Sequence, residues 1–320
     1  MSCPTPSPVP MNSTLAPYPK HLRIWQQNIN KLRAAQEDLI NSDMYKSYDL
    51  LLLQEPYIDG YGNTKATKDW RVMYPSFHLS LNSPIHSVIL VSANLDTNNW
   101  AQLMVPGSND LTGIQFKAGP SLFDIFNIYN DCHHNASMEA LDMYLKARPP
   151  PSHGASNRHM LWCGDLNRHH PLWDKERNHH LFTAAAIQAT DILLETVADH
   201  GMLMILPKDI PTLEAKAMKN RTRPDNVFCS AGAEELVVTC DTDPRLRGPG
   251  ADHIPILTTL ELPLPRTESL EARNFQLVDW GAFRESLEGQ LADLSPTPLT
   301  SEAAFQATVA EVTAALQDTT

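Results

Sequence analysis

The sequence predicts an α/β or α+β protein, and three observations lead to this prediction. The 320 residues are 42% apolar and 19% charged, a composition typical of a globular protein with a large core. Short apolar runs of strand length alternate with segments of helical periodicity. No apolar run approaches the roughly 18 to 20 residues of a membrane helix, and no repeat with a period of about 20 to 50 residues is apparent. The length fits one large α/β domain or two ordinary ones.

Secondary structure follows from the spacing of apolar residues. Residues 48–53 are apolar apart from Asp49, a pattern that favours a strand covered on both faces. Residues 31–41 place Leu32, Ala35 and Leu39 on one helical face, whereas 57–84 are predicted to form a long loop. The predicted strands are 22–27, 48–53, 86–92, 111–117, 123–129, 160–163, 202–206, 227–229, 236–239 and 255–262, and the predicted helices are 31–41, 137–148, 184–200, 279–294 and 302–316.

The two ends of the chain differ from its middle. Residues 1–20 are rich in Pro, Ser and Thr and lack the apolar segment of a secretion signal, so we expect a disordered head on a nuclear or cytoplasmic protein. The sequence Pro263-Leu264-Pro265 breaks the pattern, which predicts a folded domain over 21–264 and an acidic helical connector over 265–320.

Charge and cysteine content limit the classes of partner. Residues 254–320 hold ten acidic residues, three arginines and no lysine, so much of the net charge of −12 lies near the end of the chain. The total therefore does not exclude a nucleic-acid partner. Five cysteines form no C-x-x-C pair, which argues against a zinc knuckle or a disulfide framework. Cys163 and Cys229 lie in apolar runs and are interpreted as small buried hydrophobes.

Polar residues stand at the ends of several predicted strands. Groups at such positions converge in a crevice in open α/β sheets, even when they are distant in sequence. The run Gly164-Asp165-Leu166-Asn167-Arg168-His169-His170-Pro171-Leu172-Trp173 is the densest example. The other polar strand ends are Asn28 and Asn30, Gln54-Glu55 and Tyr129-Asn130-Asp131. Later in the sequence, Asp225 begins a predicted strand and Asp252-His253 stand just before one.

Together these residue types supply what phosphodiester hydrolysis needs. Oxygen ligands suit a hard cation such as Mg²⁺, a carboxylate can activate water, and hydrogen-bond donors can meet charge on the phosphate. A carboxylate paired with a histidine fixes the imidazole. On this reasoning Glu55, Asn30 and Asp252 are candidate metal ligands, Asp165 the base, Asn167, Tyr129 and His253 the donors, and Asp225 the partner of His253.

Basic residues provide candidate contacts to a phosphate backbone. Arg221 and Arg223 belong to a cluster with Lys216 and Lys219, and Arg245 and Arg247 form a second cluster; solvated surface charge is the alternative interpretation. Arg168 and His169, next to Asp165 and Asn167 in sequence, are also candidates for contact with DNA.

The motifs, taken in order, resemble those of the endonuclease/exonuclease/phosphatase superfamily. The similarity is greatest to the apurinic-endonuclease-like domains of non-LTR (LINE-type) retrotransposons and covers about residues 20–262. The motifs that carry it are Gln27-Asn28-Ile29-Asn30, Leu53-Gln54-Glu55-Pro56, Asn127-Ile128-Tyr129, the stretch 164–173, Pro224-Asp225-Asn226-Val227-Phe228 and Ala251-Asp252-His253-Ile254-Pro255-Ile256.

This resemblance implies a DNase I-like, four-layer sandwich of two mixed β-sheets flanked by helices. It also implies nicking of DNA that depends on Mg²⁺ or Mn²⁺ and leaves a 3′-hydroxyl for reverse transcription. The chain ends at Thr320 without an Ala-Asp-Asp sequence, so we expect the connector to be truncated before a reverse transcriptase. The implied roles are phosphate contact or metal support by Asn28 and Asn167, metal binding by Glu55 with support from Asp252, water activation by Asp165, transition-state stabilisation by Tyr129 and His253, and pairing of Asp225 with His253.

Three positions depart from the family pattern. Ala251 stands where Ser is usual, Asn130-Asp131 where many relatives have Pro, and Arg223-Pro224 where small hydroxyl residues are common. The second departure predicts an altered substrate contact. None removes a principal catalytic group, so we expect an active enzyme.

Other functions remain open at this point. A phosphatase of small phosphoesters and a repair endonuclease for abasic sites share the chemistry, since fold likeness does not settle substrate. A structural zinc protein would use the histidine pairs 133–134, 169–170 and 179–180, but adjacent histidines point apart on most backbones.

Overall fold

The computed structural model describes residues 21–76, 78–79, 83–148, 157–215, 220–266, 279–292 and 300–319. The predicted head at 1–20 and two members of the predicted basic cluster, Lys216 and Lys219, lie outside these ranges. The chain divides into two compact units, Met1–Glu268 and Ser269–Thr320.

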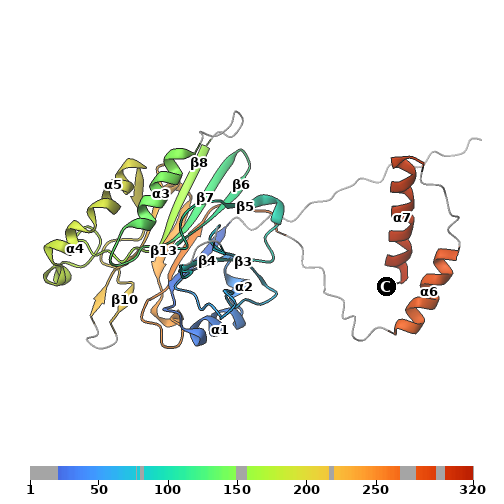
Figure 1. The fold of residues 1–320 in the computed structure, drawn as a ribbon, viewed down its shortest axis with the longest axis horizontal. Coiled ribbons are helices and arrows are strands. Elements are labelled where there is room, and N and C mark those ends of the chain that lie inside the picture. Colours follow the sequence, from blue (N-terminus) through green and yellow to red (C-terminus); the bar gives the residue numbers. More distant parts are fainter. Residues whose placement is uncertain are drawn as a thin grey trace, which may run out of the picture. The chain divides into compact units, whose positions relative to one another are not determined.

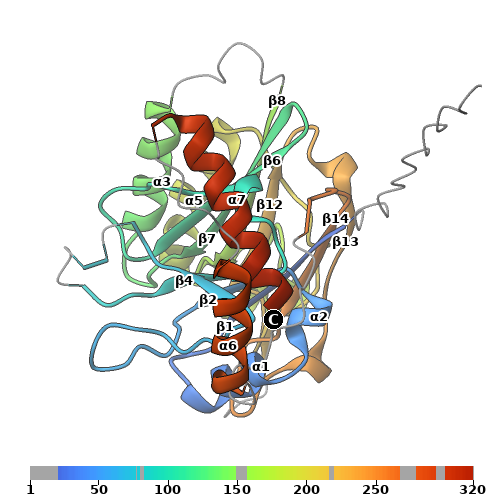
Figure 2. The ribbon, with the colours of Figure 1, turned by 90° about the vertical axis from the view of Figure 1, so that its right-hand side faces the viewer.

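The first unit contains two six-stranded mixed β-sheets (Figure 1). The strand order of the first sheet is β13-β14-β1-β2-β4-β3, and β13 and β14 lie side by side near its edge (Figure 2). Its strands are β1 (Leu22–Asn28), β2 (Leu50–Gln54), β3 (Trp70–Met73), β4 (Ser87–Ser92), β13 (Val237–Thr242) and β14 (Ile256–Leu260).

The second sheet has the order β5-β6-β7-β8-β12-β9. Its strands are β5 (Trp100–Leu103), β6 (Leu111–Ala118), β7 (Ser121–Tyr129), β8 (Asn157–Asp165), β9 (Met202–Met204) and β12 (Asp225–Ser230). A separate two-stranded hairpin is formed by β10 (Leu213–Glu214) and β11 (Arg221–Thr222).

Helices cover the outer faces of both sheets. The first sheet packs on α1 (Arg33–Asn41) and α2 (Met44–Ser47), and the second packs on α3 (Ala136–Ala147) and α5 (Asp191–Asp199), with α4 (Ala184–Gln188) before α5. Figure 1 shows α3 and α5 on one side of the paired sheets and α1 and α2 on the other. The predicted four-layer sandwich is confirmed.

The apolar run in β2 shows why both of its faces are buried. Leu50 and Leu52 belong to the core between the two sheets, whereas Leu51 and Leu53 belong to the core under α1. Side chains alternate along a strand, so a strand between two layers needs apolar residues at every position. The prediction of a strand covered on both faces is confirmed.

Three predicted boundaries differ from the structure. The predicted loop at 57–84 contains β3, whose sequence Trp-Arg-Val-Met lacks alternation. The predicted helix over 184–200 is divided into α4 and α5 near Thr190, whose buried hydroxyl donates to the carbonyl of Ala186 at 3.0 Å. The strand predicted at 160–163 extends over Asn157–Asp165 because it pairs along its whole length with β7.

The first unit continues slightly past the predicted boundary at 264. Leu264 is buried in the core between the sheets, and Arg266 donates to the buried carboxylate of Asp49 at 2.6 Å. In the second unit, α6 (Trp280–Ala292) and α7 (Glu302–Thr319) occupy the two segments predicted as acidic helices.

Among the described residues, no helix is long and apolar enough to cross a membrane. Their four cysteines are all free thiols, and Cys163 and Cys229 are buried as predicted.

Candidate active site

The predicted functional residues meet at one end of the sandwich because of the strand directions. The parallel pairs β1–β2 and β7–β8 end there, and their antiparallel neighbours β4, β6, β12 and β14 begin there. In the second sheet Asp165 pairs in register with Tyr129 on one side and Asp225 on the other. Residues separated by up to 225 positions are thus brought together.

Asp165 lies at the centre of this site, with 1% of its surface exposed. Its Oδ2 accepts a hydrogen bond from Asn28 Nδ2 at 2.8 Å, across the gap between the sheets, and its Oδ1 accepts from the backbone N–H of Asn167 at 3.0 Å. Burial, together with the negative charge of Asp225, raises the pKa of Asp165 to about 6. A carboxylate with such a pKa is suited to take a proton near neutral pH.

Gly164 allows β8 to reach this position. A Cβ at Gly164 would fall 2.0 Å from the carbonyl oxygen of Ile128 in β7, far inside contact distance. Because any side chain would push the two strands apart, the glycine before Asp165 is required for the parallel pairing that sets Asp165 beside Tyr129.

His253 and Asp225 form a buried pair. Nδ1 of His253 lies 2.9 Å from Asp225 Oδ2, and Nε2 lies 3.9 Å from Asp165 Oδ2. Burial lowers the pKa of His253, but Asp225 and Asp165 together outweigh it and raise that pKa to about 10. The imidazole is therefore protonated at neutral pH, and its Nε2 lies on the side nearest Asp165.

Asn28 links the two sheets at the site. Its Nδ2 donates to Glu55 Oε2 at 3.1 Å as well as to Asp165, and its Oδ1 accepts from the backbone N–H of Asn30. Asn30, Glu55 and Asn167 all have left-handed φ values, 50°, 46° and 49°. Such φ values strain residues other than glycine and cluster at functional sites, so three of the predicted residues occupy strained backbone here.

Tyr129 ends β7 beside the same carboxylates. Burial is the main cause of a raised pKa of its phenol, and the charges of Glu55 and Asp165 raise it further. The phenol therefore stays protonated at neutral pH and can act as a hydrogen-bond donor.

The residues present fit a divalent cation. Glu55 and Asp165 offer carboxylate oxygens bridged by one amide of Asn28, and oxygen ligands suit Mg²⁺ or Mn²⁺. Lys31 Nζ lies 3.2 Å from Glu55 Oε1 and forms an ion pair with it. Asp165, Asp225 and His253 also place potential ligand atoms within 4.8 Å of one another. Of the other predicted ligands, Asn30 is exposed and Asp252 is partly buried beside His253.

Arg168, a predicted DNA contact, lies buried beside the site. Its guanidinium is buried and donates to the carbonyls of Asp131, His134, Asn167 and Ala189 and to Asn135 Oδ1. Arg168 therefore fixes the loop after β7 against the loop after β8. These partners come from three separate segments, so sequence adjacency to Asp165 gave no indication of this role.

Arg223, also a predicted DNA contact, is buried as well. This side chain is fully buried, and its guanidinium donates to the carbonyls of Leu206 and Pro207 and to Asn226 Oδ1. Arg221 is exposed and paired with Glu214 at 3.1 Å, while His169 is partly exposed and stacks on Phe182. These two remain at the surface, where DNA can reach them.

Asn130, where the sequence predicts an altered contact with substrate, lies inside the site loops. It is fully buried, its backbone N–H donates to the carbonyl of Asp165 at 2.8 Å, and its own carbonyl accepts from Asn167 Nδ2 at 2.9 Å. The Asn130 side chain donates to the carbonyl of Leu166 and to Asn135 Oδ1, so this residue holds the loops beside Asn167 in place.

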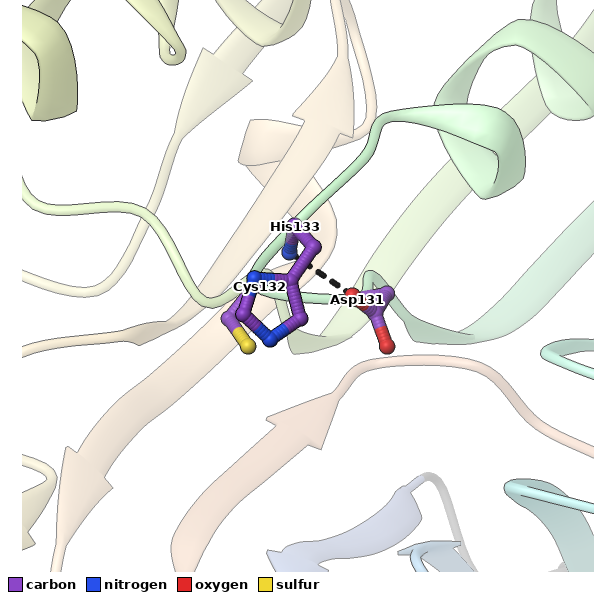
Figure 3. Close-up of side chains that lie close together, drawn as sticks. All are labelled: Asp131, Cys132 and His133. Atoms are coloured by element: carbon purple, nitrogen blue, oxygen red, sulfur yellow. Dashed lines mark hydrogen bonds between the residues drawn. The ribbon is translucent and has the colours of Figure 1, made fainter.

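The turn after Asn130 brings Asp131, Cys132 and His133 together (Figure 3). Their potential ligand atoms lie within 4.8 Å of one another, and Cys132 and His133 are exposed. The backbone N–H of His133 donates to Asp131 Oδ1 at 2.7 Å, the pattern of an Asx turn. Turn geometry alone therefore accounts for their proximity.

Comparison with solved structures identifies the fold. The endonuclease domain of TRAS1, a telomere-specific non-LTR retrotransposon, matches with a TM-score of 0.58 and 17% identity, over 75% of this chain and 99% of that chain. The AP endonuclease LMAP from Leishmania major matches with a TM-score of 0.58 and 13% identity, over 75% and 88%. An AP endonuclease from Archaeoglobus fulgidus matches with a TM-score of 0.52 and 19% identity, over 75% and 100%.

The fold is thus that of the DNase I-like endonucleases. Residues 123–257, which include Tyr129, Asp165, Asp225 and His253, match the family model described as endonuclease-reverse transcriptase. Over these residues the chain is similar to that family, and this similarity assigns it to the endonuclease-family hydrolases. None of the curated proteins compared matches the sequence.

Proposed function

We propose that this protein is a divalent-metal-dependent DNA endonuclease that hydrolyses one phosphodiester and leaves a 3′-hydroxyl, as in target-site nicking by a retrotransposon. The observation that carries the proposal is the convergence of Asp165, the Asp225–His253 pair, Asn28 and Glu55 at one end of the sandwich. The matched family description and the name of the TRAS1 domain support the choice of DNA as substrate.

The residues divide the work of hydrolysis between a base and several donors. Asp165 takes a proton from the attacking water, for which its raised pKa suits it. As water attacks phosphorus and the bond to the 3′ oxygen breaks, negative charge grows on the phosphate oxygens. The protonated Nε2 of His253 and the phenol of Tyr129 donate to these oxygens, and Asn167 contacts the phosphate.

A cation held by Glu55 and Asn28, with support from Asn30 and Asp252, would supply further stabilisation of this charge. Asp225 keeps His253 protonated and oriented, because its two carboxylate oxygens lie 2.9 and 3.2 Å from His253 Nδ1. His169 and Arg221 are the proposed surface contacts to DNA, and the segment 265–320 is the proposed connector to a reverse transcriptase.

A plasmid assay tests the proposal. Supercoiled plasmid is incubated with the protein and Mg²⁺ or Mn²⁺, with EDTA as a metal-free control and with Asp165→Ala and His253→Ala in parallel. Wild type is expected to convert the plasmid to the open circle, at least about 100-fold faster than either variant. Extension of the nicked product by a DNA polymerase without prior end repair reports the 3′-hydroxyl.

Equal rates for wild type and both variants would refute the assigned site. The AP endonucleases among the structural matches favour a second candidate, cleavage at abasic sites. A duplex oligonucleotide with one abasic analogue, compared with the same duplex intact, separates the two functions: a strong preference for the modified duplex would favour repair. Release of phosphate from small phosphoesters without nicking would favour a phosphatase.

A further inference from the structure

A second histidine–aspartate pair lies at the active-site end of the sandwich. His86 immediately precedes β4 and Asp110 immediately precedes β6. Both strands run antiparallel to strands that end at the site, β2 and β7, so both begin at the site. Neither residue belongs to the sequence motifs that resemble the superfamily, so the sequence alone did not point to them.

The contacts of this pair converge on Tyr129. Nδ1 of His86 lies 2.8 Å from Asp110 Oδ1, and the His86 ring packs on the Tyr129 ring with centroids 4.8 Å apart. The carbonyl of Asp110 accepts the backbone N–H of Tyr129 at 2.9 Å. Asp110 thus holds the backbone of Tyr129 directly and its ring through His86.

The same pair is joined to Glu55. The carbonyl of His86 accepts a hydrogen bond from the backbone N–H of Glu55 at 2.8 Å. Glu55 is one of the residues with a left-handed backbone, with a φ of 46°. Asp110 Oδ2 also accepts from Ser137 Oγ at 3.4 Å, which ties the pair to the start of α3. The side chains of His86 and Asp110 are only 17% and 21% exposed, so the pair is held by packing on several sides.

We propose that His86 is a positioning residue for the nuclease reaction, which acts through Tyr129 and is itself oriented by Asp110. The inference rests on the proposed function, since it assigns Tyr129 a hydrogen bond to the phosphate. A phenol can stabilise developing charge only if its oxygen is held in place before the reaction, and a shift of about 1 Å can cost up to about 100-fold in rate. The His86 ring restricts the Tyr129 ring on the face it covers.

The domain offers a matched control pair. Nε2 of His200 lies 2.9 Å from Asp142 Oδ1, and the two side chains are 13% and 23% exposed. The His200 ring also packs on an aromatic ring, that of Trp162, at 5.8 Å. This pair belongs to α3 and the end of α5, so His200→Ala removes a similar set of contacts without touching Tyr129.

A double-mutant cycle on nicking tests the proposal. His86→Ala is expected to lower kcat about tenfold with KM changed less than about threefold, whereas His200→Ala leaves both unchanged. In a Tyr129→Phe background, His86→Ala should cost less than about threefold, because the group that it positions is already gone. His86→Phe, which keeps a ring against Tyr129, should restore most of the activity that His86→Ala loses.

A spectroscopic measurement gives a readout that does not depend on activity. The protein is labelled with 3-fluorotyrosine, and the resonance of position 129 is assigned by its loss in Tyr129→Phe. This ¹⁹F resonance should shift or broaden in His86→Ala and stay in place in His200→Ala.

The outcomes are distinguishable. A full tenfold loss from His86→Ala in the Tyr129→Phe background would overturn the inference, because His86 would then act on the substrate itself. An unmoved ¹⁹F resonance in His86→Ala would overturn it as well. If wild type fails to nick DNA, the proposed function fails and the catalytic role of His86 fails with it, whereas nicking with additive losses overturns the inference alone.

Discussion

The middle and the end of the sandwich differ in what each strand contributes. In β8, Leu161 and Cys163 lie in the apolar core between the sheets, whereas Asp165, two residues further on the same face, is a buried carboxylate at the active site. In the first sheet, Leu52 lies in that core and the strained Glu55 follows three residues later. The apolar middle stabilises the fold, and that stability permits buried charge and left-handed backbone at the end.

The largest expected effect is a loss of nicking activity when a residue at the active-site end of the sandwich is replaced. Asp165→Asn keeps the shape of the side chain but removes the base, so the nicking rate should fall by about 1,000-fold. Because the buried carboxylate has a raised pKa, its ionised form is unfavourable in the fold, and the variant should be at least as stable as wild type at pH 7. Plasmid nicking and urea unfolding measure the two quantities, and a large loss of stability would contradict this separation.

The opposite result is expected in the middle of the sandwich. Leu52 is fully buried between the sheets, so Leu52→Ala should reduce the free energy of unfolding by about 2 to 5 kcal/mol. Below the unfolding transition, kcat per folded molecule should stay within about twofold of wild type. A loss of kcat comparable to that of Asp165→Asn would show that core and site are not separable in this way.

A substitution of Arg168 is expected to affect both nicking activity and stability, because this buried side chain holds the loops of the site together. Arg168→Met leaves several buried acceptors without a donor, which should cost about 3 kcal/mol or more of stability. It should also lower kcat about tenfold, since Asn167 loses a bond at its carbonyl. Arg148, which binds the buried Asp124 at the other end of α3, gives the control: Arg148→Met should lower stability but leave kcat per folded molecule unchanged.

The last expected effect is a pH dependence of stability. The pKa of His253 is raised in the fold from an ordinary value of 6.5 to about 10, so its contribution is fully present below about pH 6.5 and is lost as pH rises toward 10. Asp225→Asn removes the main charge that attracts the protonated His253, so the free energy of unfolding should decline less steeply with pH in this variant. Urea unfolding in EDTA between pH 6.5 and 10 measures the difference, and identical slopes would contradict a protonated His253.

The sequence by itself determined the strand pattern and the residues of the central site. A continuous apolar run such as 50–53 indicates a strand buried on both faces. The motifs at Asn28, Glu55, Tyr129, Asp165, Asp225 and His253 could be found because each lies where a strand ends or begins at the crevice. The pairing of Asp225 with His253 followed from residue chemistry and from family resemblance, and the structure places the two within hydrogen-bond distance.

Only the tertiary structure decided which polar residues face substrate and which are buried. Arg168 and Arg223 are basic residues beside catalytic motifs, yet each is enclosed by carbonyls such as those of Ala189 and Leu206, from segments distant in sequence. The pair of His86 and Asp110 likewise depends on the packing of one sheet on the other, because β4 and β6 belong to different sheets. The type of a side chain determines which groups it can bind. Its exposure and its actual hydrogen-bond partners depend on the neighbours that the packed layers place around it.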